Sequence, residues 1–224
     1  MVTSASLKKK PARPAKPAVK SAGRPRADEV EARADELARI AGKLFLEKGY
    51  SKVSLEMIAR EARVAVRTIY VKFGGKTGLL SALLLAKREQ YFGGVDLAQD
   101  QRPVKEAIGD FAARFNELIC SDESQALQRT LAAEACSNPE FVRTFFEQGP
   151  KRTRATIGAY LGRPDVRAQL RDHVPHEQLP VFLINCILGD QMTRMLLQPP
   201  LAPAARRAKE LAQRLDLFYR AVLK

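Results

Sequence analysis

Three polar side chains in one short stretch of the sequence are spaced to bind a negatively charged partner. They are Arg67, Thr68 and Tyr70, and Ile69 lies among them. On a helix, 100° steps with Ile69 turned inward point Arg67 away from the protein and place Thr68 and Tyr70 on its flanks. A guanidinium can bridge O6 and N7 of guanine, and hydroxyl groups can bind phosphate oxygens. The pattern predicts a DNA-reading face, with Arg67 as the first candidate for base readout and a phosphate contact as its alternative role.

Four neighbouring residues are expected to extend this face. Lys72 and Lys76 would supply charge, and Lys76 falls at an expected helix start, where backbone N–H groups also favour phosphate. Val66 is expected to pack against the protein, with contact to a thymine methyl group as the alternative. Ser54 is placed to cap a helix through its hydroxyl.

The elements that position these residues are two short helical patterns that meet at a three-residue corner. The first begins at Ser54 and carries an apolar stripe; the second keeps Ala65, Ile69 and Phe73 on its inner side. Two helices joined in this way are the sequence form of a helix-turn-helix. A longer helical pattern from Ala27 to Lys48, ended by Gly49, is expected to complete a three-helix unit.

A strongly basic segment precedes this unit. Residues 1–26 hold eight Lys or Arg and no acid, within a chain of formal net charge +13. Their high Pro and Lys content predicts disorder in the free protein. Arg24 and Arg26 are candidates for a narrow minor groove. The simpler interpretation, which we favour, is a tail that binds phosphates without choosing bases.

The remainder of the chain reads as a series of amphipathic helices, and no segment has the two-residue period of a strand. Helices are expected over residues 103–120 and 124–136, from Asn138 onward with a kink at Gly149-Pro150, and over 177–197 and 204–222. We therefore expect an all-α fold with a tail over 1–26, a helix-turn-helix DNA-binding domain over 27–76 and a helical regulatory and dimerisation domain over 77–224.

The second domain is expected to provide a ligand cavity and a dimer interface. Aromatic side chains are more often core than ligand-lining, but an apolar cavity with a few polar groups is the usual form of a ligand site. The cavity candidates are Phe111, Phe115, Phe141, Phe145, Tyr160 and Asn185. Stripes on the last two helices predict either half of a four-helix bundle with a second subunit or packing within one chain. The interface candidates are Phe182, Cys186, Gly189, Thr193, Leu211, Leu215 and Phe218.

The sequence offers little for catalysis, metal binding or membrane insertion. The GGKT at Gly74 to Thr77 lacks the first glycine and the preceding strand of a phosphate loop. His173 and His176 are separated by Pro175 and form too small a ligand set for zinc. Three scattered cysteines indicate a reducing compartment, and charges interrupt the longest apolar run. We expect a cytoplasmic protein that is not an enzyme and takes no cofactor or metal.

The stretch from Leu37 to Leu84 resembles the N-terminal domain of TetR-family transcriptional regulators. Leu44-Phe45 and Gly49-Tyr50 resemble the family's LF…GY pattern, and Ile58-Ala59 resembles its IA pair. Thr68 to Tyr70 reads T-I-Y where the family has T-L-Y, and Phe73, Lys76 and Leu79 match F-x-x-K-x-x-L. Residues 133–161 resemble the C-terminal domain of the AefR-like branch. The sequence departs from the family at the corner, where Arg63 replaces the usual Gly, and at Ala65, where Ser or Thr is frequent.

This resemblance implies an all-α homodimer that binds a palindromic operator in successive major grooves and represses transcription until a small apolar or amphipathic ligand spreads the two DNA-binding units. It also implies DNA contacts at Thr68, Tyr70 and Lys76, and a phosphate contact at Ser54. A non-specific architectural DNA-binding protein is the alternative, because the basic tail alone would give affinity.

Overall fold

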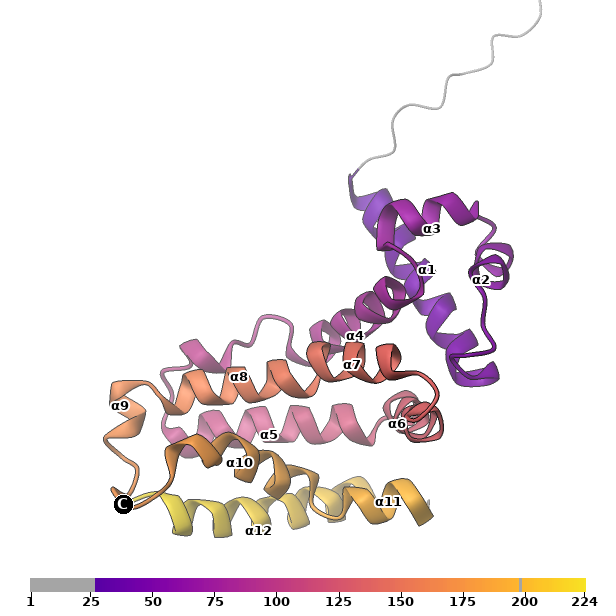
Figure 1. The fold of residues 1–224 in the computed structure, drawn as a ribbon. Helices are drawn as coiled ribbons and strands as arrows, with labels where there is room; N and C mark the ends of the chain where they lie inside the picture. The colour runs from indigo at the N-terminus through magenta and orange to yellow at the C-terminus, as the bar shows by residue number, and fades with distance from the viewer. Residues whose placement is uncertain (1–26, 198) are drawn as a thin grey trace, which may run out of the picture.

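The structure is a computed structural model that describes residues 27–197 and 199–224. Within these residues it contains helices and no strand, as expected (Figure 1). The amino-terminal helices are α1 (Ala27–Lys48), α2 (Leu55–Glu61), α3 (Val66–Phe73) and α4 (Lys76–Phe92). The remaining α-helices are α5 (Val104–Cys120), α6 (Asp122–Glu134), α7 (Pro139–Gln148), α8 (Pro150–Leu161), α9 (Pro164–Arg167), α10 (Leu179–Leu188), α11 (Gln191–Leu197) and α12 (Ala204–Val222). Two short 3₁₀ turns lie at Leu97–Gln99 and His176–Gln178.

The corner between α2 and α3 has the geometry of a helix-turn-helix. Ser54 caps α2 as predicted, since its side chain accepts a hydrogen bond from the Met57 N–H at 3.3 Å. Arg63 adopts φ = 54° and is the one described non-glycine residue with positive φ, a conformation that costs an L-residue about 1–2 kcal/mol. Ala65 is the N-cap of α3 and offers no side-chain hydrogen bond. Its side chain is exposed, so its expected inward position is wrong.

The amino-terminal core extends past the predicted domain boundary between residues 76 and 77. Leu79 and Leu80 of α4 are fully buried in the same cluster as Phe45, Ile58 and Ile69. That cluster also takes Leu127 from α6 and Phe141 from α7. The helix-turn-helix therefore completes its core with side chains that follow residue 76 in the chain.

The second core lies among α5, α8, α10 and α12 (Figure 1). Ile108 and Phe111 of α5, Ile157 of α8, Leu183 of α10 and Phe218 of α12 are all buried there. Burial of such side chains stabilises the fold by about 1.5–3 kcal/mol each before conformational entropy is counted. This helical body forms a long layer from which α4 leads to the helix-turn-helix.

The expected continuous helix over residues 177–197 is interrupted. Gly189 adopts φ = 55° and ψ = −124°, a conformation open essentially to glycine alone, and the chain restarts as α11. The Arg214 guanidinium of α12 binds the freed end of α10, with Nε donating to the Cys186 carbonyl at 2.6 Å and Nη2 to the Ile187 carbonyl at 3.3 Å. The prediction of Gly189 as a mid-helix packing position is therefore wrong.

Candidate nucleic-acid interface and ligand cavity

The outer face of α3 carries the predicted DNA-reading residues. Ile69 is fully buried beneath them, whereas Arg67 is exposed and the Tyr70 side chain is 57% exposed. Thr68 is partly exposed between them. Val71, on the same outer face as Arg67, is 77% exposed, so its side chain does not pack in the core. Val66 is half-buried against the amino-terminal core, in agreement with a packing role.

The ammonium of Lys76 is bound by groups of the protein itself. Its ammonium donates to the carbonyls of Tyr50 at 2.6 Å and Val53 at 2.8 Å, and Nζ lies 4.2 Å from the centre of the Tyr50 ring. Partial burial lowers the pKa of Lys76, while the charge of Glu134 opposes that shift. The ammonium thus ties the start of α4 to the turn between α1 and α2, and the phosphate contact of Lys76 stays a prediction.

Four other residues were predicted to contact DNA. Lys72 is exposed at the end of α3, and Ser54 is exposed while its oxygen caps α2. The Ser54 hydroxyl also donates to the Glu56 carboxylate and lowers the pKa of that group, so the phosphate contact of Ser54 stays a prediction. Arg24 and Arg26 lie outside the described residues.

A cavity of about 370 Å³ lies between α4, α5, α6, the α7–α8 corner and α10. Three of the six predicted ligand residues line it: Phe115, Phe145 and Asn185. The other three, Phe111, Phe141 and Tyr160, do not line it and are 2% exposed or less; their ring carbons belong to the hydrophobic cores, so their assignment to the ligand site is corrected. Most of the exposed surface inside the cavity is apolar, from side chains such as Leu84, Leu118, Ile119, Leu127, Val181, Ile184 and Leu188.

The cavity also contains polar groups that the sequence analysis did not single out. Arg88 of α4 is partly buried and donates to the Thr156 hydroxyl at 3.2 Å. Burial and the charge of Arg152 lower the pKa of the Arg88 guanidinium, while the charges of Asp96 and Glu89 oppose that shift. The Gln148 side-chain oxygen is buried without a hydrogen-bond partner among the described residues. The available signal for Arg88 was its position four residues after Leu84 on an otherwise apolar helix face.

A network of contacts joins α6 and α7 to the turn that precedes the helix-turn-helix. The Glu134 carboxylate accepts from the Ser51 N–H at 2.9 and 3.1 Å and from the Ser51 hydroxyl, and Asn138 donates to the same carboxylate at 2.5 Å. The Tyr50 and Phe141 rings stack with their centres 4.4 Å apart. Burial, with the charges of Glu140 and Glu134, raises the pKa of Tyr50 to about 12. We call the Glu134–Ser51 hydrogen bonds and the Tyr50–Phe141 stack the α6–α7 clasp.

The predicted dimer residues fall into two groups. Leu211, Leu215 and Phe218 are at most 5% exposed and pack within their own chain, so the alternative of intramolecular packing holds for them and their interface role is wrong. Phe182 is 42% exposed and its ring lies 5.4 Å from that of Phe218.

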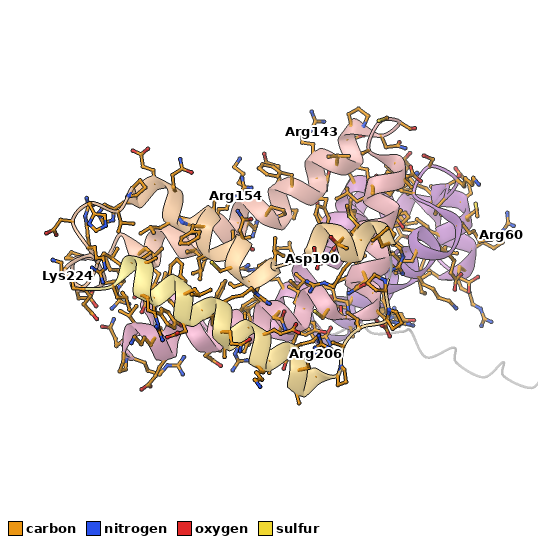
Figure 2. The ribbon with its side chains drawn as sticks, turned by 90° about the horizontal axis from the view of Figure 1, so that it is seen from below. Arg60, Arg143, Arg154, Asp190, Arg206 and Lys224 are labelled. Atoms are coloured by element: carbon orange, nitrogen blue, oxygen red, sulfur yellow. The ribbon has the colours of Figure 1, made fainter. Side chains whose placement is uncertain are left out.

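Other side chains on α10 to α12 remain accessible. Cys186 is half-buried and Thr193 is exposed. Leu217, which the sequence analysis did not select, is 67% exposed on α12. Figure 2 shows that α12 crosses the side of the molecule seen from below.

The described ranges offer little for a metal site or a membrane span. These residues include no group of three or more His, Cys, Asp or Glu side chains that could hold a metal ion. No single described helix is long and apolar enough to cross a membrane; α3 and α4 together would pass that test, but they are bent by 61° at their junction.

An exposed helix-turn-helix joined to a helical body with an internal cavity is the architecture of a one-component transcriptional regulator. A family profile described as bacterial regulatory proteins, tetR family, matches residues 39–83. A second profile, described as the C-terminal domain of AefR-like transcriptional repressors, matches residues 106–221. The chain belongs to the TetR family of transcriptional regulators and carries an AefR-like C-terminal domain.

Solved structures share this fold over nearly their whole length. A TetR-family regulator from Mesorhizobium loti is 18% identical with a TM-score of 0.69, and the match covers 87% of this chain and 98% of that one. The flavonoid-responsive regulator FrrA is 25% identical with a TM-score of 0.68, over 86% and 98% of the two chains. NalD of Pseudomonas aeruginosa, the secondary repressor of the MexAB-OprM multidrug efflux pump, is 22% identical with a TM-score of 0.56, over 88% and 98%. A search of curated proteins gave no significant match.

Proposed function

We propose that this regulator is a cytoplasmic homodimer that represses transcription from a palindromic operator and responds to a small ligand bound in its helical body. The observation that carries the proposal is the combination in one chain of an exposed recognition face on α3 and an apolar cavity about 370 Å³ in volume. The likeness to FrrA, a regulator named as flavonoid-responsive, supports a response to a small molecule.

On the DNA side, Arg67 reads a base edge while the neighbouring side chains hold the protein on the backbone. Thr68 and Tyr70 flank Arg67 and donate to phosphates, and Lys72 adds charge. Ser54 and Lys76 bind phosphates near the starts of α2 and α4, and Arg24 and Arg26 approach the minor groove or neighbouring phosphates. Val71 contacts a thymine methyl group.

Dimerisation uses the outer face of α10 and α12. Phe182 and Leu217 are large apolar side chains left exposed there, at 42% and 67%. Cys186 and Thr193 lie on the helices of the same region and are at least partly accessible. A second copy of the chain would bury this surface and place two recognition helices on one palindrome.

The ligand acts on DNA binding through α6 and α7. Both helices line the cavity, through Leu127 and Gln128 of α6 and Phe145 and Gln148 of α7. The same two helices carry Glu134 and Phe141 of the α6–α7 clasp, which contact Ser51 and Tyr50 next to the helix-turn-helix. A ligand that favours one arrangement of α6 and α7 therefore shifts the preferred position of the recognition helix.

The decisive experiment is to sequence the DNA that the purified full-length protein retains from random fragments, and then to footprint the enriched sites at two salt concentrations. A regulator enriches and protects a short two-fold site. The architectural alternative gives affinity that falls with salt and no preferred site. Failure to enrich any palindrome would refute the proposed operator binding.

A further inference from the structure

The charge distribution around the cavity points to the chemical class of its ligand. This inference rests on the proposed function, because it concerns the same cavity and deepens the ligand response assigned to it. The cavity wall contains three basic residues, Lys87, Arg88 and Arg154, and none of the residues that line the cavity is acidic. The three residues differ in whether other groups of the protein, or water, already stabilise their positive charges.

Lys87 and Arg154 sit in environments that satisfy them without a ligand. The Lys87 ammonium forms an ion pair with Glu123 of α6. Arg154 of α8 is exposed to solvent, and its guanidinium lies 5.6 Å from the centre of the Phe146 ring. Water and the π-face can stabilise an exposed guanidinium. Neither residue therefore requires a further anionic partner.

Arg88 is the one of these three residues whose charge has neither an ion-pair partner in the described part of the chain nor full exposure to solvent. It is partly buried, its hydrogen-bond partner is the neutral Thr156 hydroxyl at 3.2 Å, and its guanidinium lies 5.3 Å from the centre of the Phe92 ring. No salt bridge joins it to a carboxylate in the described part of the chain. Arg152 adds a like charge nearby, and Asp96 and Glu89 oppose it only from beyond ion-pair distance. A guanidinium in such a site binds a carboxylate or a phenolate with charge-assisted hydrogen bonds.

The rest of the wall limits the body of the ligand. Gln148 lines the cavity, but its side-chain oxygen is closed off from the cavity space and is not a contact for the ligand. The apolar wall requires that the rest of the molecule be hydrocarbon or aromatic.

We propose that the ligand is an amphipathic organic anion whose acidic oxygens bind Arg88 while its apolar body fills the cavity. The volume of about 370 Å³ lies at the lower end of the range of roughly 300–1,000 Å³ found for small-molecule pockets. Cationic amphiphiles are disfavoured at this site, because the charges of Arg88 and Arg152 repel them.

The test is calorimetric titration of the full chain, without DNA, with three probes that share a ten-carbon tail: decanoate, decanol and decyltrimethylammonium. We expect decanoate to bind about ten- to a hundredfold more tightly than decanol, the range for a charged hydrogen bond. Arg88→Gln should remove that preference and leave the affinity for decanol unchanged, which also shows that the cavity is intact. Arg88→Lys should retain part of the preference, since it keeps the charge.

Arg143→Gln is the matched control. Arg143 is exposed, does not line the cavity and projects from the molecule in Figure 2, so its loss should not change the binding of any probe. Equal affinity for decanoate and decanol, tighter binding of decyltrimethylammonium, or an undiminished preference for decanoate in Arg88→Gln would overturn the anion assignment. If none of the three probes binds, the ligand response itself fails, a result distinct from the loss of charge preference. Operator enrichment is measured separately on the unliganded protein.

Discussion

Side chains on the outer face of α3 have unequal roles in the proposed DNA complex. Arg67 points away from a fully buried Ile69, so its guanidinium is free to reach a base edge. We expect Arg67→Ala to weaken operator binding by roughly 1–3 kcal/mol and to relax preference at one base-pair position. Binding-site selection with the variant measures both effects.

Lys72→Ala is the comparison for this prediction. A phosphate contact carries no sequence information, so its loss should weaken all sites alike and reduce the slope of log affinity against log salt by about 1. If Arg67→Ala also weakens all sequences equally, Arg67 is a phosphate contact and base readout lies elsewhere on α3.

The corner residue Arg63 carries backbone strain that a glycine would relieve. Its φ of 54° is in the left-handed region and its side chain is exposed. We expect Arg63→Gly to raise the free energy of unfolding by on the order of 1 kcal/mol, the difference between the left-handed cost of an L-residue and the greater chain entropy of glycine. Urea denaturation measures the change. Arg63→Ala keeps the Cβ and should give no gain; equal stabilisation by both would show that the guanidinium, not the backbone, is responsible.

Which residues line the cavity was only partly predictable from the sequence. Periodicity places Phe111 and Phe115 on one face of α5, but it cannot tell which ring meets another helix and which meets empty space. Phe111 packs 5.2 Å from the Phe92 ring centre, whereas Phe115 reaches the cavity. The difference depends on how α4 crosses α5, which no local pattern encodes. By contrast, the inward Ile69 and outward Arg67 follow from a single helix and were predicted.

At the scale of elements, the α6–α7 clasp should make stability depend on pH. Partial burial raises the pKa of Glu134, but the hydrogen bonds from Ser51 and the charge of Lys76 outweigh it, so the pKa lies below the ordinary value of 4.5. A carboxyl with a lowered pKa in the folded state stabilises it above the unfolded value, and this contribution is lost as the pH falls through the folded pKa.

Glu134→Gln should therefore be less stable than the wild type near neutral pH, and the gap should close as the pH falls below 4.5. Urea denaturation across this pH range measures the difference in the free energy of unfolding between the variant and the wild type. Glu117→Gln, at an exposed position of α5, is the control and should leave the profile unchanged. If the difference in stability between Glu134→Gln and the wild type persists below the lowered pKa, side-chain packing rather than the charge of Glu134 stabilises the α6–α7 clasp.

Helix ends were predicted well where capping or proline signals mark them. The end of α1 at Lys48 and both ends of α12, at Ala204 and Val222, agree with the sequence analysis. The break at Gly189 was missed because apolar residues keep a helical period on both sides of it. Its cause lies in another element: Arg214 of α12 occupies the space where the Gly189 side chain would be, with Cζ 2.9 Å from an added Cβ.

For the whole molecule, the exposed apolar surface on α10 and α12 predicts the state of association. Leu217→Glu should shift the monomer–dimer equilibrium toward monomer by on the order of 100-fold, because burying an unpaired carboxylate costs several kcal/mol. Sedimentation equilibrium measures this shift. Ala159→Glu, an exposed position on α8, adds the same charge on another helix and should leave the equilibrium unchanged. If Leu217→Glu remains as dimeric as the wild type, dimerisation does not use this part of α12.

The sequence could not show whether the apolar side of α12 packs within its own chain or against a second subunit. Leu211, Leu215 and Phe218 have the same period in either arrangement, and only the positions of α5 and α10 show that they are covered within one chain. Leu217 is the informative residue on this helix, because it is apolar, exposed and outside that stripe.

The amino-terminal core shared with Leu127 and Phe141 has a practical consequence for building chimeric regulators. A fragment that ends at the predicted boundary after Lys76 would lack Leu79 and Leu80 and would leave Phe45 and Ile69 partly uncovered. Exchanging recognition units between relatives therefore requires a graft that extends through α4 and retains compatible partners at Glu134 and Phe141. A sensor that combines this cavity with a new operator is best made by replacing side chains on the outer face of α3 within the intact chain.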